Sequence, residues 1–382
     1  MINPLSRINF AAIQARLTTY KNRVVETAQP LIHTLGQAVN VPLRWFGSKT
    51  FSIPGIIVRF PVVAIKHLLG KNDPAMTFKE ELLPQKGYTW FTHKDLKPED
   101  AKEYLLHATA AGCVHRNNVS WLEPFGYTPI PAERFTVDAV KDEYAIFDKE
   151  TGIKIILFQK GDELLLVFGA LRTHESQFKP QDLKESNKLT TKVKLSCLSS
   201  LLGGKPALYT RANELVSQIM QSDVVKGKKV TICGQSLGGS IASYVGLQQQ
   251  IPAVALNGFP LGAGLQQLIG KEKLDNADQI VSNIRVKGDY WCDVPVIIKL
   301  FDIFVSGLGL KTPGNFGKLL DVPAIHTGAQ NNHVDVYGAL ASWWKPECKP
   351  LCLDRFSADS QSRSESSKKL AKIVAEQFAN SR

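Results

Sequence analysis

The chain has 382 residues, of which 44% are hydrophobic and 21% charged, and it contains six cysteines. This composition excludes a disordered or collagen-like chain, and so few scattered cysteines exclude a disulfide-built scaffold. The net charge of +11 is concentrated at the start, because residues 1–72 hold nine Lys or Arg and only one acid, Glu26. This asymmetry favours a segment that meets an anionic surface, although a solvated basic face gives the same pattern.

The N-terminal segment also contains the most apolar stretch, residues 51–70. Pro54, Pro61, Arg59 and Lys66 interrupt it, so we do not expect a membrane-spanning helix. Residues 1–17 lack the continuous apolar core of a secretory signal, which predicts a cytoplasmic or peripheral membrane protein. We therefore predict that residues 1–75 form a basic, mainly helical extension that binds an anionic membrane surface. The alternative is a helical pair that packs on the main domain.

The middle of the chain, residues 76–345, is typical of an α/β domain. Antiparallel strands come first, and helices and strands then alternate, which predicts a mostly parallel central sheet with helices on both faces. In such sheets the functional residues follow the carboxyl ends of the strands. The predicted helices are 98–111, ended by Gly112, 207–221 and 237–249, and the predicted strands are 143–147, 153–158, 164–168, 229–233, 253–256 and 279–286.

Residues 346–382 are predicted to form a polar tail. The run 357–367 has the composition of a flexible linker, and residues 368–378 have the periodicity of a short amphipathic helix. Cys348 and Cys352 have the spacing of half a zinc site, but no second pair of ligands lies near them in the sequence. We therefore predict no metal site.

The clearest motif is Gly234-Gln-Ser-Leu-Gly238, a G-x-S-x-G. A β-run precedes it and a helix of small residues follows, which is the context of a nucleophile elbow, where the serine lies on a sharp strand-to-helix turn. Small glycines on both sides allow the strand and helix to approach. We therefore predict that Ser236 is a nucleophile.

A nucleophilic serine needs a histidine base, and the base needs a carboxylate that orients it. In the order Ser, Asp, His, the acid follows a later strand and the histidine lies near the end of the domain. Asp289, three residues past the strand 279–286, is the favoured acid, and Asp293 is its competitor. His333, on a loop that enters a helix, is favoured as the base over His326.

An oxyanion hole needs two backbone N–H groups. One comes from the residue after the nucleophile, here Leu237, and the other from the loop after an earlier strand, where Ala170 is the first choice and Leu171 the second. Cys233, beside the elbow, is interpreted as a buried strand residue, because buried thiols are usually inert.

The motifs around Ser236 resemble those of the class 3 lipase family of α/β-hydrolases over residues 144–344. The family's elbow, G-H-S-L-G-G-A, is similar to Gly234-Gln-Ser-Leu-Gly-Gly-Ser240, with glutamine in place of histidine. The family's F-R-G-T, F-G-x-P-x-x-G, D-x-V-P and H-x-x-Y motifs resemble, in turn, the segments that begin at Phe168, Leu256, Asp293 and His333.

The resemblance implies an α/β-hydrolase fold and a serine esterase that hydrolyses carboxylic esters of acyl lipids without a metal or organic cofactor. The polar residues 172–194 occupy the position of the family's lid, and the apolar residues 296–310 are suited to an acyl pocket, a bilayer contact or a core helix. A membrane-binding adaptor without turnover is the alternative. Nucleic acid is not an expected partner, because apolar residues interrupt the basic segment.

Overall fold

The computed structural model describes residues 94–116, 118–169, 204–289, 314–326 and 329–354, with short helical pieces at 193, 196–197, 199–200, 365–366, 369–374 and 376. The basic extension predicted for 1–75 lies outside these residues, as do the apolar segment 296–310 and, apart from 193, the predicted lid 172–194. Among the helices described, none has the length and apolar content needed to cross a bilayer.

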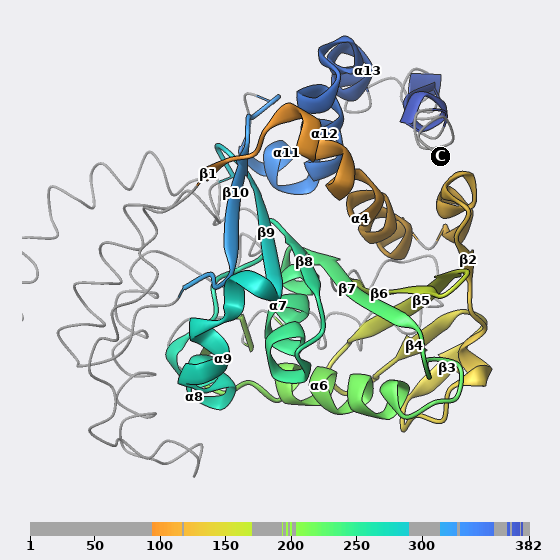
Figure 1. Ribbon diagram of the computed structural model, residues 1–382, viewed down its shortest axis with the longest axis vertical. Helices are drawn as coiled ribbons and strands as arrows, with labels where there is room; N and C mark the ends of the chain where they lie inside the picture. The colour runs from red at the N-terminus through yellow and green to blue at the C-terminus, as the bar shows by residue number, and fades with distance from the viewer. Residues whose placement is uncertain are drawn as a thin grey trace, which may run out of the picture. The chain divides into compact units, whose positions relative to one another are not determined.

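A ten-stranded sheet forms the centre of the described residues (Figure 1). The strand order is β1-β10-β9-β8-β7-β6-β5-β4-β3, with β2 paired to β5. Along this order, each pair of neighbours from β1 through β10, β9, β8 and β7 to β6 is parallel. The pairs β6–β5, β5–β4, β4–β3 and β2–β5 are antiparallel. The predicted fold class, a mostly parallel sheet that begins with antiparallel strands, is confirmed. The strands are β1 (Lys94–Asp95), β2 (Thr128–Pro129), β3 (Val140–Asp142), β4 (Ala145–Phe147), β5 (Lys154–Lys160), β6 (Glu163–Gly169), β7 (Lys229–Gln235), β8 (Ala253–Leu256), β9 (Val281–Val286) and β10 (Lys318–Val322).

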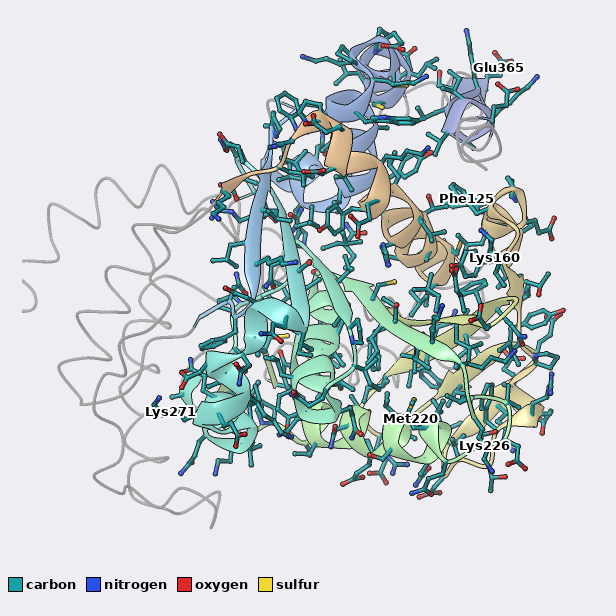
Figure 2. The ribbon with its side chains drawn as sticks, viewed as in Figure 1. Phe125, Lys160, Met220, Lys226, Lys271 and Glu365 are labelled. Atoms are coloured by element: carbon teal, nitrogen blue, oxygen red, sulfur yellow. The ribbon has the colours of Figure 1, made fainter. Side chains whose placement is uncertain are left out.

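Helices cover both faces of the sheet. In Figure 1, α4 (Pro98–Arg116) and α12 (Val336–Trp344) lie on one face, and α6 (Ala207–Met220) and α7 (Leu237–Gln249) lie on the other. Figure 2 shows the side chains of α6 and the turn after it, including Met220 and Lys226, on the face away from α4. The other elements are α8 (Ala263–Ile269), α9 (Lys271–Asp275), α11 (Ala329–Val334), α13 (Lys349–Asp354) and the 3-10 helices η3 (Val119–Phe125), η4 (Ala132–Arg134), η6 (Ala277–Gln279) and η7 (Pro346–Cys348).

The side chains of β6 alternate between the two helical layers. Leu164, Leu166 and Phe168 pack with α6 and α7, whereas Leu165 and Val167 pack with α4 and α12. Successive side chains of a strand point to opposite faces, so a strand covered on both faces is apolar throughout. This explains why the sequence of β6 is a continuous apolar run.

Helix α4 is longer than predicted. The sequence placed its end at Gly112, but the helix continues to Arg116. Gly112 lies inside the helix and faces the ring of Trp121, which a Cβ at this position would meet at 3.4 Å. The glycine is therefore an interior residue of the helix and not its terminator.

Strand β10 was not predicted, and it pairs in parallel with β9 and β1. The strands and helices predicted between 143 and 286 lie within a few residues of their predicted ranges, whereas helices α8, α9 and α11 were not predicted. In the C-terminal tail, residues 369–374 are helical, and Leu370 and Val374, four positions apart, are fully buried. This spacing is that of the apolar face predicted for residues 368–378.

Candidate active site

Ser236 lies on the turn between β7 and α7. Its φ is +57°, a left-handed conformation that serine rarely adopts, and the residue is the N-cap of α7. The backbone N–H of Ser236 donates to the carbonyl of Leu256 at 2.9 Å, and its carbonyl accepts from the N–H of Ser240 at 3.1 Å. Strained backbone of this kind persists only where the surrounding structure holds it, and it is frequent at active sites.

Glycines make this turn possible. A Cβ added at Gly234 would lie 2.3 Å from the carbonyl oxygen of Gly238, and one added at Gly238 would lie 2.6 Å from that of Phe168. Both distances are far below van der Waals contact, so strand and helix could not approach this closely with larger residues. The spacing of the G-x-S-x-G motif thus has the steric origin that the sequence predicts.

Asp289 follows β9 on a tight turn. Its backbone N–H donates to the carbonyl of Val286 at 3.2 Å, and Gly288, between them, has a φ of +79°. Asp289 is completely buried. The turn places its carboxylate just beyond the carboxyl end of β9, within hydrogen-bond distance of His333.

His333 joins the serine and the aspartate. Its Nδ1 lies 2.8 Å from Oδ2 of Asp289, and its Nε2 lies 2.8 Å from Oγ of Ser236. An ionised carboxylate can only accept, so Nδ1 carries the proton and Nε2 accepts from the serine hydroxyl. The prediction placed His333 on a loop, but it lies in α11, a helix of six residues. Only a short helix fits there, because the chain turns again at Asp335 to begin α12.

The three side chains differ in exposure. Asp289 is fully buried and His333 is 7% exposed, whereas Ser236 is half-buried. The ring of Phe259 stacks against that of His333, with 6.0 Å between centroids and 25° between planes. A nucleophile reachable from solvent, with a base and a carboxylate shielded behind it, is suited to attack on an electrophilic carbonyl.

His326, the competitor of His333, has a different partner. Its Nε2 donates to Oδ2 of Asp335 at 3.0 Å, and both side chains are buried. Asp293, the competing acid, lies outside the described residues, as do Ala170 and Leu171, the residues predicted to supply the second oxyanion donor. Leu237 is the first residue of α7, where backbone N–H groups have no acceptor within the helix.

Cys233, two residues before Gln235 in β7, is a buried strand residue as predicted. Burial raises the pKa of its thiol well above the ordinary value, which disfavours the nucleophilic thiolate. Its Sγ lies 3.8 Å from the carbonyl oxygen of His107 in α4. Among the residues that the structure describes, no group of three or more His, Cys, Asp or Glu is arranged to hold a metal ion.

Two residues of the site were not predicted from the sequence. Gln235, directly before the serine, donates to the carbonyls of His333 and Val334 at 3.0 and 3.1 Å. Asn257, directly after β8, donates to the carbonyls of Asn332 and His333 at 3.0 and 3.1 Å. Each residue has a weak signal in the sequence. Gln235 occupies the variable position before the serine of the elbow motif, and Asn257 is a polar residue directly after a buried apolar strand.

Comparison with known proteins gives structural likeness only. No model of a protein family matches the chain, and no curated protein matches it. The fold is similar to that of a lipase from Rhizopus microsporus var. chinensis, at 12% identity and a TM-score of 0.32, covering 63% of this chain and 81% of the lipase. A triacylglycerol lipase from Penicillium expansum is 13% identical, with a TM-score of 0.28, and the match covers 60% of this chain and 82% of that lipase. The Rhizomucor miehei lipase in its propeptide complex is 10% identical, with a TM-score of 0.30, and the match covers 66% of this chain and 79% of that lipase.

Proposed function

We propose that this protein is a serine esterase that hydrolyses carboxylic esters of acyl lipids at a membrane surface, with the chemistry of a class 3 lipase. The observation that carries the proposal is the chain of two 2.8 Å contacts from Asp289 through His333 to Ser236. A serine hydroxyl is a weak nucleophile at neutral pH, and a hydrogen-bonded neutral imidazole activates it.

In the first half of the reaction, Oγ of Ser236 attacks the ester carbonyl while Nε2 of His333 takes the hydroxyl proton. The tetrahedral intermediate collapses, the bond to the alcohol oxygen breaks, and His333 gives its proton to the leaving alcohol. In the second half, His333 takes a proton from water, the hydroxide attacks the acyl-serine, and the carboxylic acid leaves as Ser236 recovers its proton. Asp289 keeps the ring in the required tautomer and stabilises the imidazolium.

The oxyanion requires preorganised donors. We assign one to the backbone N–H of Leu237, because this group is at the start of α7, where the helix dipole also favours negative charge. We assign the second donor to the backbone N–H of Ala170, from its position in the sequence directly after β6.

The substrate class rests on sequence features. The basic residues 1–72 with apolar interleaving suit an anionic membrane surface, and the apolar residues 296–310 suit an acyl chain. Esters of acyl lipids combine both requirements, because the scissile bond lies between a polar head and an apolar chain.

A fluorophosphonate probe tests the proposal directly, since it modifies only an activated serine. We expect the full chain to be labelled, Ser236→Ala not to be labelled, and Ser217→Ala, a control in α6, to be labelled as the wild type is. Release of fatty acid from vesicles of mixed phospholipid and neutral lipid should follow the same order. Folded wild-type protein that is not labelled, with or without vesicles, would overturn the proposal and leave the membrane-binding adaptor as the better interpretation.

A further inference from the structure

The backbone that carries His333 ends a helix and presents three consecutive carbonyls. In a continuous α-helix the carbonyls of Asn332, His333 and Val334 would accept from the N–H groups four positions later. The chain instead leaves the helical conformation at Asp335, whose φ and ψ are −109° and 51°, and α12 begins after it. The last carbonyls of a helix need other partners, and buried ones are costly to leave unpaired.

The donors are the side-chain amides of Gln235 and Asn257. The amide nitrogen of Gln235 is 3.0 Å from the carbonyl oxygen of His333 and 3.1 Å from that of Val334. The amide nitrogen of Asn257 is 3.0 Å from the carbonyl oxygen of Asn332 and 3.1 Å from that of His333. Both amides therefore meet at the carbonyl of His333 itself.

Both amides come from rigid positions. Gln235 is the last residue of β7 and is 9% exposed, and Asn257 follows β8 and is fully buried. Oδ1 of Asn257 accepts from the backbone N–H of Val286 at 2.8 Å, which ties the residue to the end of β9. Its φ of +45° is in the left-handed region, which asparagine tolerates better than most residues. The two side chains thus have fixed orientations set by three neighbouring strands.

We propose that Gln235 and Asn257 are positioning residues that hold the backbone of His333 so that its ring stays between Ser236 and Asp289. This inference deepens the proposed function and rests on it for its effect on activity. Both amides act through the main chain of the base, since the groups they bind are backbone carbonyls. Because Gln235 is bonded directly to Ser236, the same strand end that directs the nucleophile also fixes the base.

The position of a catalytic group matters steeply, since a displacement of about 1 Å costs on the order of 100-fold in rate. Without the two amides, α11 keeps its other contacts, but the backbone of His333 loses the hydrogen bonds that restrain it. The 2.8 Å contact between Nε2 of His333 and Oγ of Ser236 is then less well fixed. We therefore expect loss of either amide to lower the reactivity of Ser236 with little change in probe binding.

The first test replaces Gln235 and uses a matched control. Gln235→Leu removes the donor and keeps the volume. Gln266→Leu does the same to a buried glutamine of α8, which donates to the carbonyl of Leu261 at 2.8 Å instead of to that of His333. We expect Gln235→Leu to lower the rate constant of fluorophosphonate labelling at saturating probe by about 10- to 100-fold, with the half-saturating concentration unchanged. Gln266→Leu should stay within about twofold of the wild type.

The second test applies the same design to Asn257. Asn257→Asp keeps an oxygen for the N–H of Val286 but has no amide hydrogen to donate and repels the carbonyl oxygens. Asn283→Asp, in β9, removes a matching donor, because Asn283 is buried and donates to the carbonyl of Phe316 at 2.7 Å. We expect at least about tenfold slower labelling for Asn257→Asp only. Urea midpoints of all four variants separate this effect from loss of folding.

A third measurement does not depend on activity. In a proton NMR spectrum of protein with isotope-labelled histidine, the Nδ1 proton of His333, hydrogen-bonded to Asp289, should give a strongly downfield resonance. We expect this resonance to shift or broaden in Gln235→Leu and to remain unchanged in Gln266→Leu. An unchanged resonance together with labelling equal to that of Gln266→Leu would overturn the inference. If folded wild-type protein is not labelled, the proposed function fails, and the resonance still tests the positioning role by itself.

Discussion

The Nε2 atom of His326 lies 3.0 Å from Oδ2 of Asp335, so a second buried histidine–carboxylate pair stands next to the segment that carries His333. Oδ1 of the same aspartate caps α12, since it accepts from the backbone N–H of Gly338 at 2.9 Å. Asn332 adds two hydrogen bonds to the backbone of His326, at 3.1 and 3.0 Å. The pair therefore joins the chain after β10 to the start of α12.

We expect Asp335→Ala to lower the free energy of unfolding by about 2–4 kcal/mol, because it removes a helix cap and leaves a buried imidazole without its acceptor. Asp335→Asn keeps an oxygen for the N–H of Gly338 and should lose about half as much. Urea denaturation followed by circular dichroism measures both. Equal stability of Asp335→Ala and wild type would show that the pair contributes nothing to the fold.

Stability should fall in mild acid because of His107. Burial lowers the pKa of this histidine from 6.5 to about 4. Between these values the unfolded chain binds a proton that the folded chain does not, so the stability present at neutral pH is lost as the pH decreases through this window. Because the ring is partly exposed, we expect only about 1 kcal/mol to be lost between about pH 7 and 5.5.

The variant His107→Gln isolates that contribution. Its urea midpoint should decrease less than that of the wild type over the same pH range, while the contributions of other groups remain in both proteins. Parallel pH dependences of the two midpoints would show that His107 does not titrate abnormally.

Strain at the elbow predicts a stabilising but inactivating substitution. Ser236 has a φ of +57°, which glycine adopts without strain and alanine does not. Ser236→Gly and Ser236→Ala both lose the hydroxyl, yet we expect the glycine variant to be about 1 kcal/mol more stable than the alanine variant. Thermal denaturation of the two side by side measures the difference, and an alanine variant as stable as the glycine variant would argue against strain at this turn.

The acid of the triad can be assigned by a pair of substitutions. Asp289→Asn keeps the shape of the side chain but favours the wrong imidazole tautomer, so we expect labelling and hydrolysis to fall by about 10⁴-fold. Asp293→Asn, the competitor predicted from the sequence, should leave both rates within a few fold. The assignment is wrong if the second variant loses activity and the first retains it.

The parts of the site that could be predicted are those with local signatures. Ser236 lies in a short motif whose glycines have an immediate steric reason, and Asp289 follows a recognisable strand by three residues. His333 could be chosen by its order in the chain and its proximity to a helix start. Each of these depends on a few neighbouring residues.

The remaining features depend on contacts between distant residues. Gln235 and Asn257 are separated from His333 by 98 and 76 positions, and no periodicity indicates such a contact. Strand β10 is short and mixes Lys318 and Asp321 with apolar residues, which hides it from pattern analysis. Helix α4 continues past Gly112 to Arg116, because an isolated glycine lowers helix propensity without ending a helix.

The ends of β7, β8 and β9 supply Gln235, Asn257 and Asp289, and all three groups converge on one histidine from a helix near the end of the domain. During synthesis, a chain that has emerged only as far as α7 has its serine without the base. The proposed reactivity therefore requires the finished sheet, and we expect a nascent or partly folded chain not to react with the probe. In refolding, the helical circular dichroism signal should recover before probe labelling does. The time course of labelling then measures when α11 docks on the sheet.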